Sequence, residues 1–485
     1  MRSLLRGWKA LGLVLLLVLT LMPAAASAAR SGRDYELTVV FAGGAIPAGA
    51  REKLEKAGAK VERTVPEVGV VQARGKASMI PALRQVAGVQ YVAPSLTWKL
   101  QVERTYALAA EAAAAPGDLY DAYQWDIKQV TKDGASWRIS KGSHRTTVGV
   151  IDSGINAQHQ DLRANYLGGR NFVPAGTGGD PTETGGPDDV NDRVGHGSHV
   201  AGTIAGDGRI YGVGPNLGIR AYRVFGADVG AQTSWITAAM VAAARDRVDV
   251  ISMSLGGYDV LGKVRWTDPD TGVTYDLGDD HADLVAWKRA FEYVSKQNIV
   301  VVAAAGNEAI DAGDPKAIVA FLNEVYGPEG FQFEGEGIEV PGGIRGAVAV
   351  SATGPDRSMA SYSNYGKQFV AVAAPGGDFQ RYPEGDWYTD MCLSADMDYG
   401  DGVSGYVFMA GTSMAAPKTA AAAALYIDQY RAKNRGRRPE PEVTIKALQR
   451  SATDLGRRGY DAYYGYGMVD VAKLLSGGRE GRDHD

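Results

Sequence analysis

The feature that most constrains the fold is a series of short, nearly uninterrupted apolar runs separated by helical stretches. These runs, rich in Val, Ile and Ala, are residues 146–152, 248–255, 298–305, 347–352 and 369–374. Strands that are buried on both faces have this composition. Stretches such as 233–245 and 282–297 lie between them and are predicted helices. Alternating strand and helix predict an α/β fold of three layers (αβα) around a central, mostly parallel sheet.

Polar side chains with catalytic chemistry follow two of these predicted strands. Asp152 ends the run 146–152, and functional groups in such sheets gather at the carboxyl ends of the strands. Asn307 follows the run 298–305, and its amide can donate a hydrogen bond to an oxyanion. Taken singly, an aspartate at the end of a strand is more often a cap or turn residue, and Asn307 would be an ordinary turn asparagine.

Two of the six histidines, His196 and His199, lie in the segment GHGSHVAGT at 195–203. Their spacing also fits a pair of metal ligands. No further His, Cys or suitably spaced Glu completes a zinc set, and the single cysteine, Cys392, excludes both a disulfide within the chain and a multi-cysteine metal site. A histidine that acts as a general base fits this segment better.

The segment GTSMAAP at 411–417 opens an alanine-rich run, 418–432, that is predicted to be a long buried helix. Ser413 therefore lies at or just before a helix N-terminus, where free N–H groups and the helix dipole favour a developing anion. A serine nucleophile needs a base and a carboxylate that orients the base. His196 and Asp152 are the candidates upstream.

Four segments, in this order, resemble the signatures of the subtilisin-like serine proteases, the subtilases: VIDSGI (150–155), GHGSHVAGT (195–203), AAAGNE (303–308) and GTSMAAP (411–417). The resemblance extends over residues 120–475. It implies a subtilisin-like fold and an endopeptidase that cleaves peptide bonds through an acyl-enzyme. Ser413 is then the nucleophile, His196 the general base and acid, and Asp152 the orienting carboxylate. Asn307 and the Ser413 backbone N–H form the oxyanion hole.

The resemblance also implies where substrate binds. Ser254, Leu255 and Gly256 correspond to the strand that pairs with the substrate backbone and walls the primary pocket. Ala305 and Gly306, in the stretch 303–306, line the opposite wall. His199 is then a structural residue. No residue in the sequence indicates a charged or aromatic substrate preference.

The family implies no cofactor for catalysis and a structural Ca²⁺. Asp161 stands where many subtilases have a calcium ligand, but the partnering loop, 207–211, is shorter than in the calcium-binding members. Acidic clusters with oxygen ligands that also suit Ca²⁺ occur at 188–192, 268–272 and 396–401. Asp161 is the calcium ligand that the resemblance favours.

The N-terminus has the pattern of a secretory signal peptide, residues 1–28. Arg2, Arg6 and Lys9 precede the apolar run 10–22, and small residues follow at 26–28. The alternative is an uncleaved anchor, but the apolar run is short for the ~20 residues that span a bilayer. We expect a secreted, extracellular protein with no membrane association after the signal is removed.

Residues 30–98 are a predicted small α+β domain that resembles the inhibitory propeptides of secreted subtilases. Strands are predicted at 35–41, 61–71 and 89–92, and helices at 47–59 and 78–86. Residues 99–117 are predicted to be a linker that contains the maturation site, because 106–116 is mostly alanine. The peptidase domain then covers 118–475, and a polar tail covers 476–485.

Charge differs between these parts. Residues 30–115 contain 12 Lys/Arg and 8 Asp/Glu, a net charge of +4, and the signal region adds +3. Because the whole chain carries −5, the remainder carries −12. A basic domain before an acidic one favours an intramolecular complex, with the propeptide as inhibitor. An acidic main domain argues against nucleic acid as a partner. We expect a monomer that acts on protein or peptide substrates.

Three further regions, 258–280, 311–341 and 377–405, show little periodicity and are predicted surface insertions.

The sequence allows three alternatives to a subtilisin-like protease. Asn307 and His196 argue against an acid-acting relative with Asp as oxyanion donor and Glu as base. The order Asp, His, Ser argues against another α/β hydrolase. A catalytically silent binding module with this fold is the third alternative, and no triad member is substituted.

Overall fold

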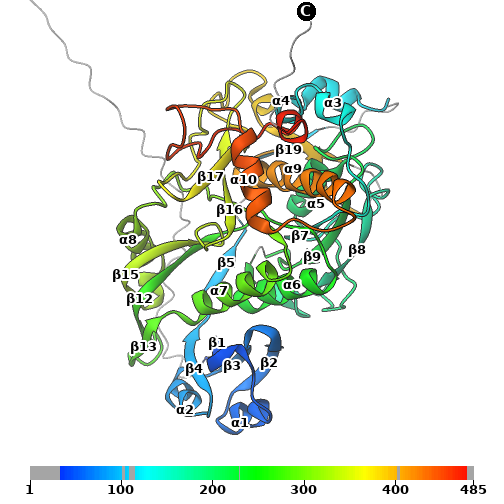
Figure 1. Ribbon diagram of the computed structural model, residues 1–485. Coiled ribbons are helices and arrows are strands. Elements are labelled where there is room, and N and C mark those ends of the chain that lie inside the picture. Colours follow the sequence, from blue (N-terminus) through cyan, green and yellow to red (C-terminus); the bar gives the residue numbers. More distant parts are fainter. Residues whose placement is uncertain (1–32, 101–103, 109–114, 229, 401–404, 478–485) are drawn as a thin grey trace, which may run out of the picture.

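A seven-stranded sheet in which every pairing is parallel forms the centre of the larger part of the molecule (Figure 1). The computed structural model describes residues 33–100, 104–108, 115–228, 230–400 and 405–477, so the predicted signal peptide and residues 478–485 of the tail lie outside it. The sheet order is β17 (Val370–Pro375), β16 (Ala347–Thr353), β14 (Val300–Ala304), β11 (Val250–Met253), β7 (Thr147–Asp152), β9 (Gly218–Arg223) and β8 (Tyr166–Asn171). The predicted fold class is confirmed.

The strands are apolar throughout because helices cover both faces of the sheet. Val148 and Val150 of β7 belong to one buried cluster, together with α5 (His196–Ala205) and α9 (Thr412–Lys433). Ile151 points to the other face, toward α6 (Thr233–Arg245) and α7 (Ala282–Ser295). Alternate side chains of a strand point to opposite faces, so both sets are buried. Figure 1 shows the two helix layers on either side of the sheet.

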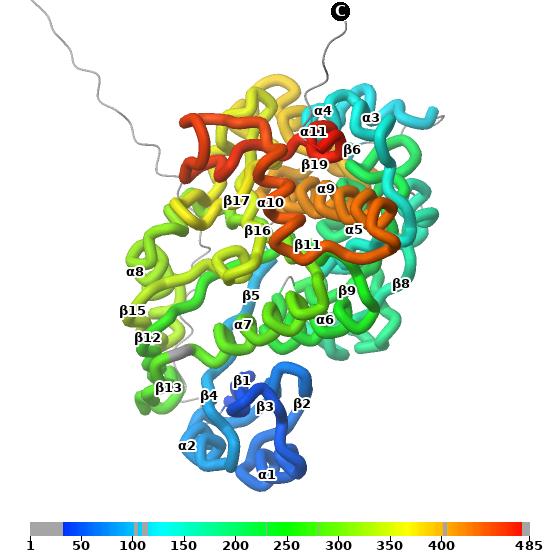
Figure 2. The backbone as a smooth tube through the Cα atoms, viewed as in Figure 1, coloured from blue at the N-terminus to red at the C-terminus, as the bar shows by residue number. Residues whose placement is uncertain are grey.

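The small N-terminal domain packs against α6 and α7, below them in Figure 2. Its antiparallel sheet has the order β2 (Lys60–Val65), β3 (Val70–Gly75), β1 (Tyr35–Phe41) and β4 (Val89–Pro94), and its helices are α1 (Ala50–Lys56) and α2 (Ile80–Arg84). The single strand predicted at 61–71 was wrong, because β2 and β3 form a hairpin. The turn requires Gly69, which has a φ of 66° and no room for a Cβ beside the Gly44 backbone.

The interval predicted as a linker, 99–117, contains regular structure. Residues Thr97–Lys99 form β5, which pairs antiparallel with β10 (Gly230–Gln232). Residues Arg104–Leu108 form β6, which pairs antiparallel with β19 (Tyr406–Ala410), itself paired with β18 (Cys392–Ala395). The prediction missed both strands because their hydrogen bonds go to partners more than 100 residues away. Figure 1 shows β5 running from the small domain into the large one.

Two of the three predicted insertions together form an ordered layer rather than irregular loops. β13 (Thr274–Asp280), β12 (Gly257–Thr267) and β15 (Phe331–Val340) form an antiparallel sheet, and α8 (Pro315–Tyr326) packs on β15. The rings of Phe331 and Phe333 stack 5.6 Å apart beneath it. The third insertion, 377–405, contains β18. The remaining helices are α3 (Asp118–Tyr123), α4 (Trp125–Thr131), α10 (Pro441–Ser451) and α11 (Val471–Leu475).

None of the described helices combines the length and the apolar character that a membrane span requires.

Candidate active site

Asp152 and His196 form a buried pair at the carboxyl edge of the central sheet. Asp152 is the last residue of β7, and His196 is the first residue of α5. The His196 Nδ1 lies 2.7 Å from the Asp152 Oδ1, and each residue is 1% exposed. Burial lowers the pKa of His196, but the Asp152 carboxylate outweighs it and holds the pKa above the usual value. The Asp152 carboxylate can therefore orient the His196 imidazole and stabilise its protonated form.

The first turn of α5 is held by Asp192, a residue that the sequence prediction placed only in an acidic cluster. One carboxylate oxygen accepts the Gly195 N–H at 2.9 Å, and the other accepts the Ser198 N–H at 2.8 Å. The first of these oxygens, Oδ1, also accepts the Ser153 hydroxyl at 2.9 Å. Asp192 therefore accepts backbone N–H groups at the start of α5, whose N-cap residue is Gly195, and so helps to fix the position of His196. An aspartate four residues before the histidine was the signal in the sequence.

Ser413 is the second residue of α9, which packs beside α5. Its hydroxyl donates to the Ser254 carbonyl at 3.2 Å, and the Ser254 hydroxyl donates to the Ser413 carbonyl at 2.7 Å. The His196 Nε2 has no hydrogen-bond partner among the described residues. Catalytic hydrogen bonds often form fully only when substrate is bound, so this geometry leaves His196 available as a base.

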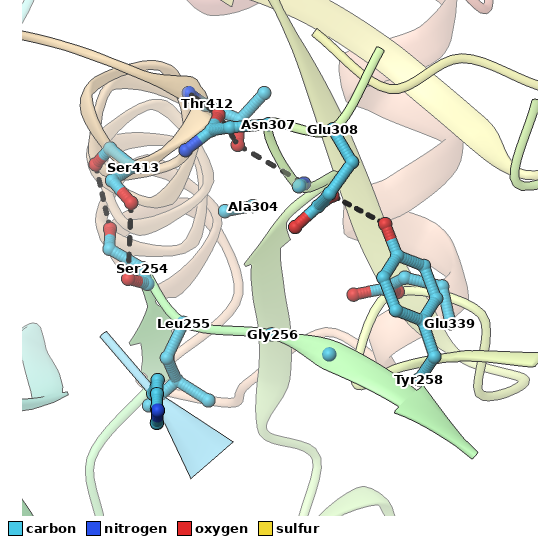
Figure 3. Close-up of a pocket in the computed structure, with 13 residues that line it drawn as sticks. Ser254, Leu255, Gly256, Tyr258, Ala304, Asn307, Glu308, Glu339, Thr412 and Ser413 are labelled. Carbon is cyan, nitrogen blue, oxygen red and sulfur yellow. Dashed lines mark hydrogen bonds between the residues drawn. The ribbon is translucent and has the colours of Figure 1, made fainter. Parts of the chain in front are cut away.

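The amide of Asn307 is oriented by the residue before the serine. Its oxygen accepts the Thr412 N–H at 2.9 Å and the Thr412 hydroxyl at 2.8 Å. Since the oxygen is engaged, the amide nitrogen is the end directed to the Ser413 side, as Figure 3 shows. The N–H of Gly306 donates to the same Thr412 hydroxyl at 3.1 Å. Thr412 is a supporting residue that the sequence prediction did not single out.

A pocket opens beside Ser413, between two of the predicted walls (Figure 3). Ser254, Leu255 and Gly256 line one side, and Gly306 lines the other. Ala304 lines this second wall in place of Ala305. Ala305 is fully buried behind the wall, because alternate residues at the end of a strand point to opposite sides.

Two carboxylates, Glu308 and Glu339, also line this pocket, together with Tyr258. The sequence prediction had none of the three. Glu308 directly follows Asn307, so it lay within a recognised motif. Glu339 and Tyr258 lie in the predicted insertions, where no local pattern marks a pocket residue.

His199 was predicted to be a structural residue, and Asp161 was predicted to be a calcium ligand. The His199 Nε2 lies 2.8 Å from the Cys392 carbonyl oxygen, and burial lowers the pKa of His199 to about 3. This neutral, buried imidazole suits the structural role that was predicted. The Asp161 Oδ2 accepts the N–H groups of Arg209 and Ile210 and the Tyr406 hydroxyl.

The three groups that donate hydrogen bonds to the Asp161 carboxylate do not fit a calcium site at this residue. No group of three or more His, Cys, Asp or Glu side chains that could hold a metal ion occurs among the described residues. The donors at Asp161 are N–H and O–H groups, whereas Ca²⁺ requires several oxygen ligands. A structural Ca²⁺ elsewhere stays a prediction.

Comparisons with known proteins show the family of the chain. The family model described as the subtilase family matches residues 143–467. The nisin leader peptide-processing serine protease NisP of Lactococcus lactis subsp. lactis is 33% identical over 326 residues, 65% of this chain and 45% of that protein. The epidermin leader peptide-processing serine protease EpiP of Staphylococcus epidermidis is 27% identical over 445 residues, 88% of this chain and 90% of that protein.

A solved structure extends the similarity to the small domain. The crystal structure of EpiP from Staphylococcus aureus has a TM-score of 0.75 and 28% identity, and the match covers 92% of this chain and 99% of that one. The chain thus spans less than half the length of the nisin protease and nine-tenths of the epidermin protease.

Proposed function

Because the chain belongs to the subtilase family and is a serine endopeptidase, we propose that Asp152, His196 and Ser413 are its catalytic triad. The observation that carries this assignment is the 2.7 Å contact of His196 with Asp152, beside the helix that has Ser413 in its first turn. Ser413 Oγ attacks the substrate carbonyl carbon while His196 Nε2 takes its proton. His196 then protonates the leaving amine, and water hydrolyses the acyl-enzyme.

The oxyanion of this reaction is bound by the Asn307 amide and the Ser413 backbone N–H. The hydrogen bonds from Thr412 support this role, because they hold the Asn307 oxygen away from the developing charge. The N-terminal end of α9 adds the favourable field of its dipole. Donors that are fixed before the reaction stabilise the transition state without reorganisation.

We further propose that the protein is made as a zymogen that cleaves itself. The strands on either side of residues 101–103 support this proposal, because both pair with the main domain: β5 pairs with β10, and β6 pairs with β19. Arg104 is opposite Ala410, three residues before Ser413. We therefore propose that maturation cleaves the chain within residues 100–104, a narrower interval than the predicted linker. Extension of a sheet by substrate is a common mode of peptide recognition.

The location and partners follow from the same proposal. The predicted signal peptide would direct the chain out of the cytoplasm, and the small domain would inhibit the site until it is removed. The substrates are extended segments of proteins or peptides. Two relatives are named for processing leader peptides, and we include such peptides as candidate substrates. We propose that the matured enzyme is a monomer.

Fluorophosphonate labelling of the secreted protein tests the proposal. The wild type should be labelled at Ser413 and should lose its N-terminal domain by cleavage within residues 100–104. Ser413→Ala should be unlabelled and should accumulate as the uncleaved precursor. Ser358→Ala, at an exposed serine that is 55 positions before Ser413 in the sequence, is the matched control and should behave as wild type. A folded, processed wild type without labelling would favour a silent binding module instead.

A further inference from the structure

The end of the pocket opposite Ser413 is formed by two carboxylates, Glu308 and Glu339, that lie 31 positions apart in the chain. Figure 3 shows both carboxylates together across the pocket from Ser413. The Glu308 carboxylate is fixed in place: its Oε2 accepts the Tyr258 hydroxyl and the Asn364 amide, the latter at 2.7 Å. Asn364 is fully buried. The position of Glu308 is therefore set by the fold and not by solvent.

Glu339 is the less satisfied of the two carboxylates. It is 1% exposed, and its Oε2 accepts the Gly343 N–H at 2.9 Å. Its Oε1 is buried without a hydrogen-bond partner. This oxygen lies against the pocket wall, since a Cβ on Gly256 would be 2.7 Å from it. A buried acceptor without a donor costs free energy, so the site lacks a donor that a ligand can supply.

Among the described residues that line the pocket, Lys99 is the only basic one. Lys99 is exposed and belongs to β5, which the proposed maturation removes from the enzyme. The matured pocket then has two carboxylates and no cation among the described residues that line it. An apolar side chain in this pocket would leave the Glu339 oxygen unpaired. A guanidinium or ammonium group would supply hydrogen-bond donors for this oxygen and a positive charge beside the two carboxylates.

Given the endopeptidase function proposed above, we propose that this pocket selects substrates with Arg or Lys immediately before the scissile bond. Glu308 is held in place for the cation, and Glu339 is the buried acceptor at the pocket wall. Burial and the neighbouring Glu308 raise the pKa of Glu339 well above its usual value, so a bound cation also favours its ionised form. Specificity of this kind comes from buried polar groups that only the correct substrate satisfies.

Peptide substrates that differ only in the residue before the scissile bond test this inference on the matured enzyme. We expect kcat/KM to be highest for Arg or Lys and lower for Leu, Phe and Glu. Glu339→Gln and Glu308→Gln should each lower kcat/KM for the Arg peptide by roughly 10- to 100-fold, the range for losing a hydrogen bond to a charged group. The Leu peptide should change less than about threefold.

Glu336→Gln is the matched control, because Glu336 lies on the same strand, β15, but is exposed. It should leave both peptides unchanged, and Glu339→Asp should recover part of the preference for Arg. Equal losses for the Arg and Leu peptides, or a wild type that prefers Leu or Phe, would overturn the inference.

Fluorophosphonate labelling of each variant separates this result from the proposed function. Labelled enzyme without a basic preference overturns the inference alone. Absence of labelling in the wild type overturns the proposed function and the inference with it.

Discussion

The indole N–H of Trp98 donates a 2.7 Å hydrogen bond to the hydroxyl of Thr233, and this contact joins the small domain to the first turn of α6. The Trp98 ring also lies edge-on to Trp287, with centroids 5.7 Å apart. It is 2% exposed. A buried tryptophan of this kind typically dominates the energy of the interface that it occupies.

Trp98→Ala should therefore weaken the complex between the two domains by about 2–4 kcal/mol. We expect a lower Tm of the precursor in the Ser413→Ala background and earlier onset of activity in the self-cleaving protein. Trp98→Phe keeps most of the ring contact and loses only the hydrogen bond, so it should cost about 1 kcal/mol. Equal Tm values for all three precursors would show that the contact does not stabilise the complex.

Asn307→Leu should lower kcat by about 10²–10³-fold and leave KM nearly unchanged, because the lost donor acts on the transition state. Thr412→Val removes one of the two hydrogen bonds that orient the Asn307 oxygen and should give a smaller loss of kcat. Steady-state kinetics of the matured enzymes measure both effects. A change confined to KM would contradict the assignment of Asn307 to the oxyanion hole.

His281 should make the stability of the protein depend on pH. It lies 3.2 Å from Asp259 and 4.0 Å from Asp283, and Asp283 accepts the Leu96 N–H of the N-terminal segment at 2.8 Å. Burial lowers the pKa of His281, but the Asp259 carboxylate outweighs it and raises the pKa to about 9. Because the folded pKa is above the unfolded value, the stabilisation is complete below the unfolded pKa of about 6.5.

This stabilisation, on the order of 3 kcal/mol, should be lost as the pH rises from about 6.5 through 9. The free energy of unfolding of the Ser413→Ala precursor, measured across this range, should fall by that amount. His281→Gln should flatten this part of the profile. His144→Gln, at an exposed histidine, is the control and should keep the slope. A wild-type profile that rises with pH would contradict the ion pair.

Lys418 forms a buried ion pair within the main domain. Its Nζ lies 2.7 Å from the Asp126 Oδ2 and donates to the Met414 carbonyl at 3.0 Å, and both charged residues are at most 1% exposed. Lys418→Met leaves Asp126 buried and unpaired, which should cost about 3–5 kcal/mol.

The double variant Lys418→Met/Asp126→Leu should recover much of this loss, since an apolar pair avoids the unpaired charge. Urea unfolding in the Ser413→Ala background measures both variants. A double variant as unstable as the single one would show that the packing of Lys418, and not its charge, matters.

Much of the central architecture could be predicted from local pattern. The strands β7, β11 and β14 are apolar runs because both faces of the sheet are covered, and α6 begins and ends where its periodicity indicates. Asp152 is the last residue of β7, Asn307 follows β14, and Ser413 lies in the first turn of α9. The ends of these elements therefore set the positions of the three residues. The order of the motifs around them identified the family.

What local pattern could not predict depends on partners that are distant in the chain. The strands β5 and β6 form through hydrogen bonds to β10 and β19, which lie more than 100 residues away in the chain. Glu339 has no local feature that distinguishes it from an exposed glutamate on the same strand.

The sequence by itself determined the class of fold, the family and the identity of the candidate nucleophile, base and oxyanion donor. Those features depend on side-chain periodicity and on short motifs that each occupy one stretch of chain. Only the tertiary structure decided that Glu308 and Glu339 share one pocket with Ser413 and that β5 and β6 pair with strands of the main domain. The reason is physical: burial, charge proximity and strand pairing are properties of contacts, and these contacts join residues that no local pattern connects.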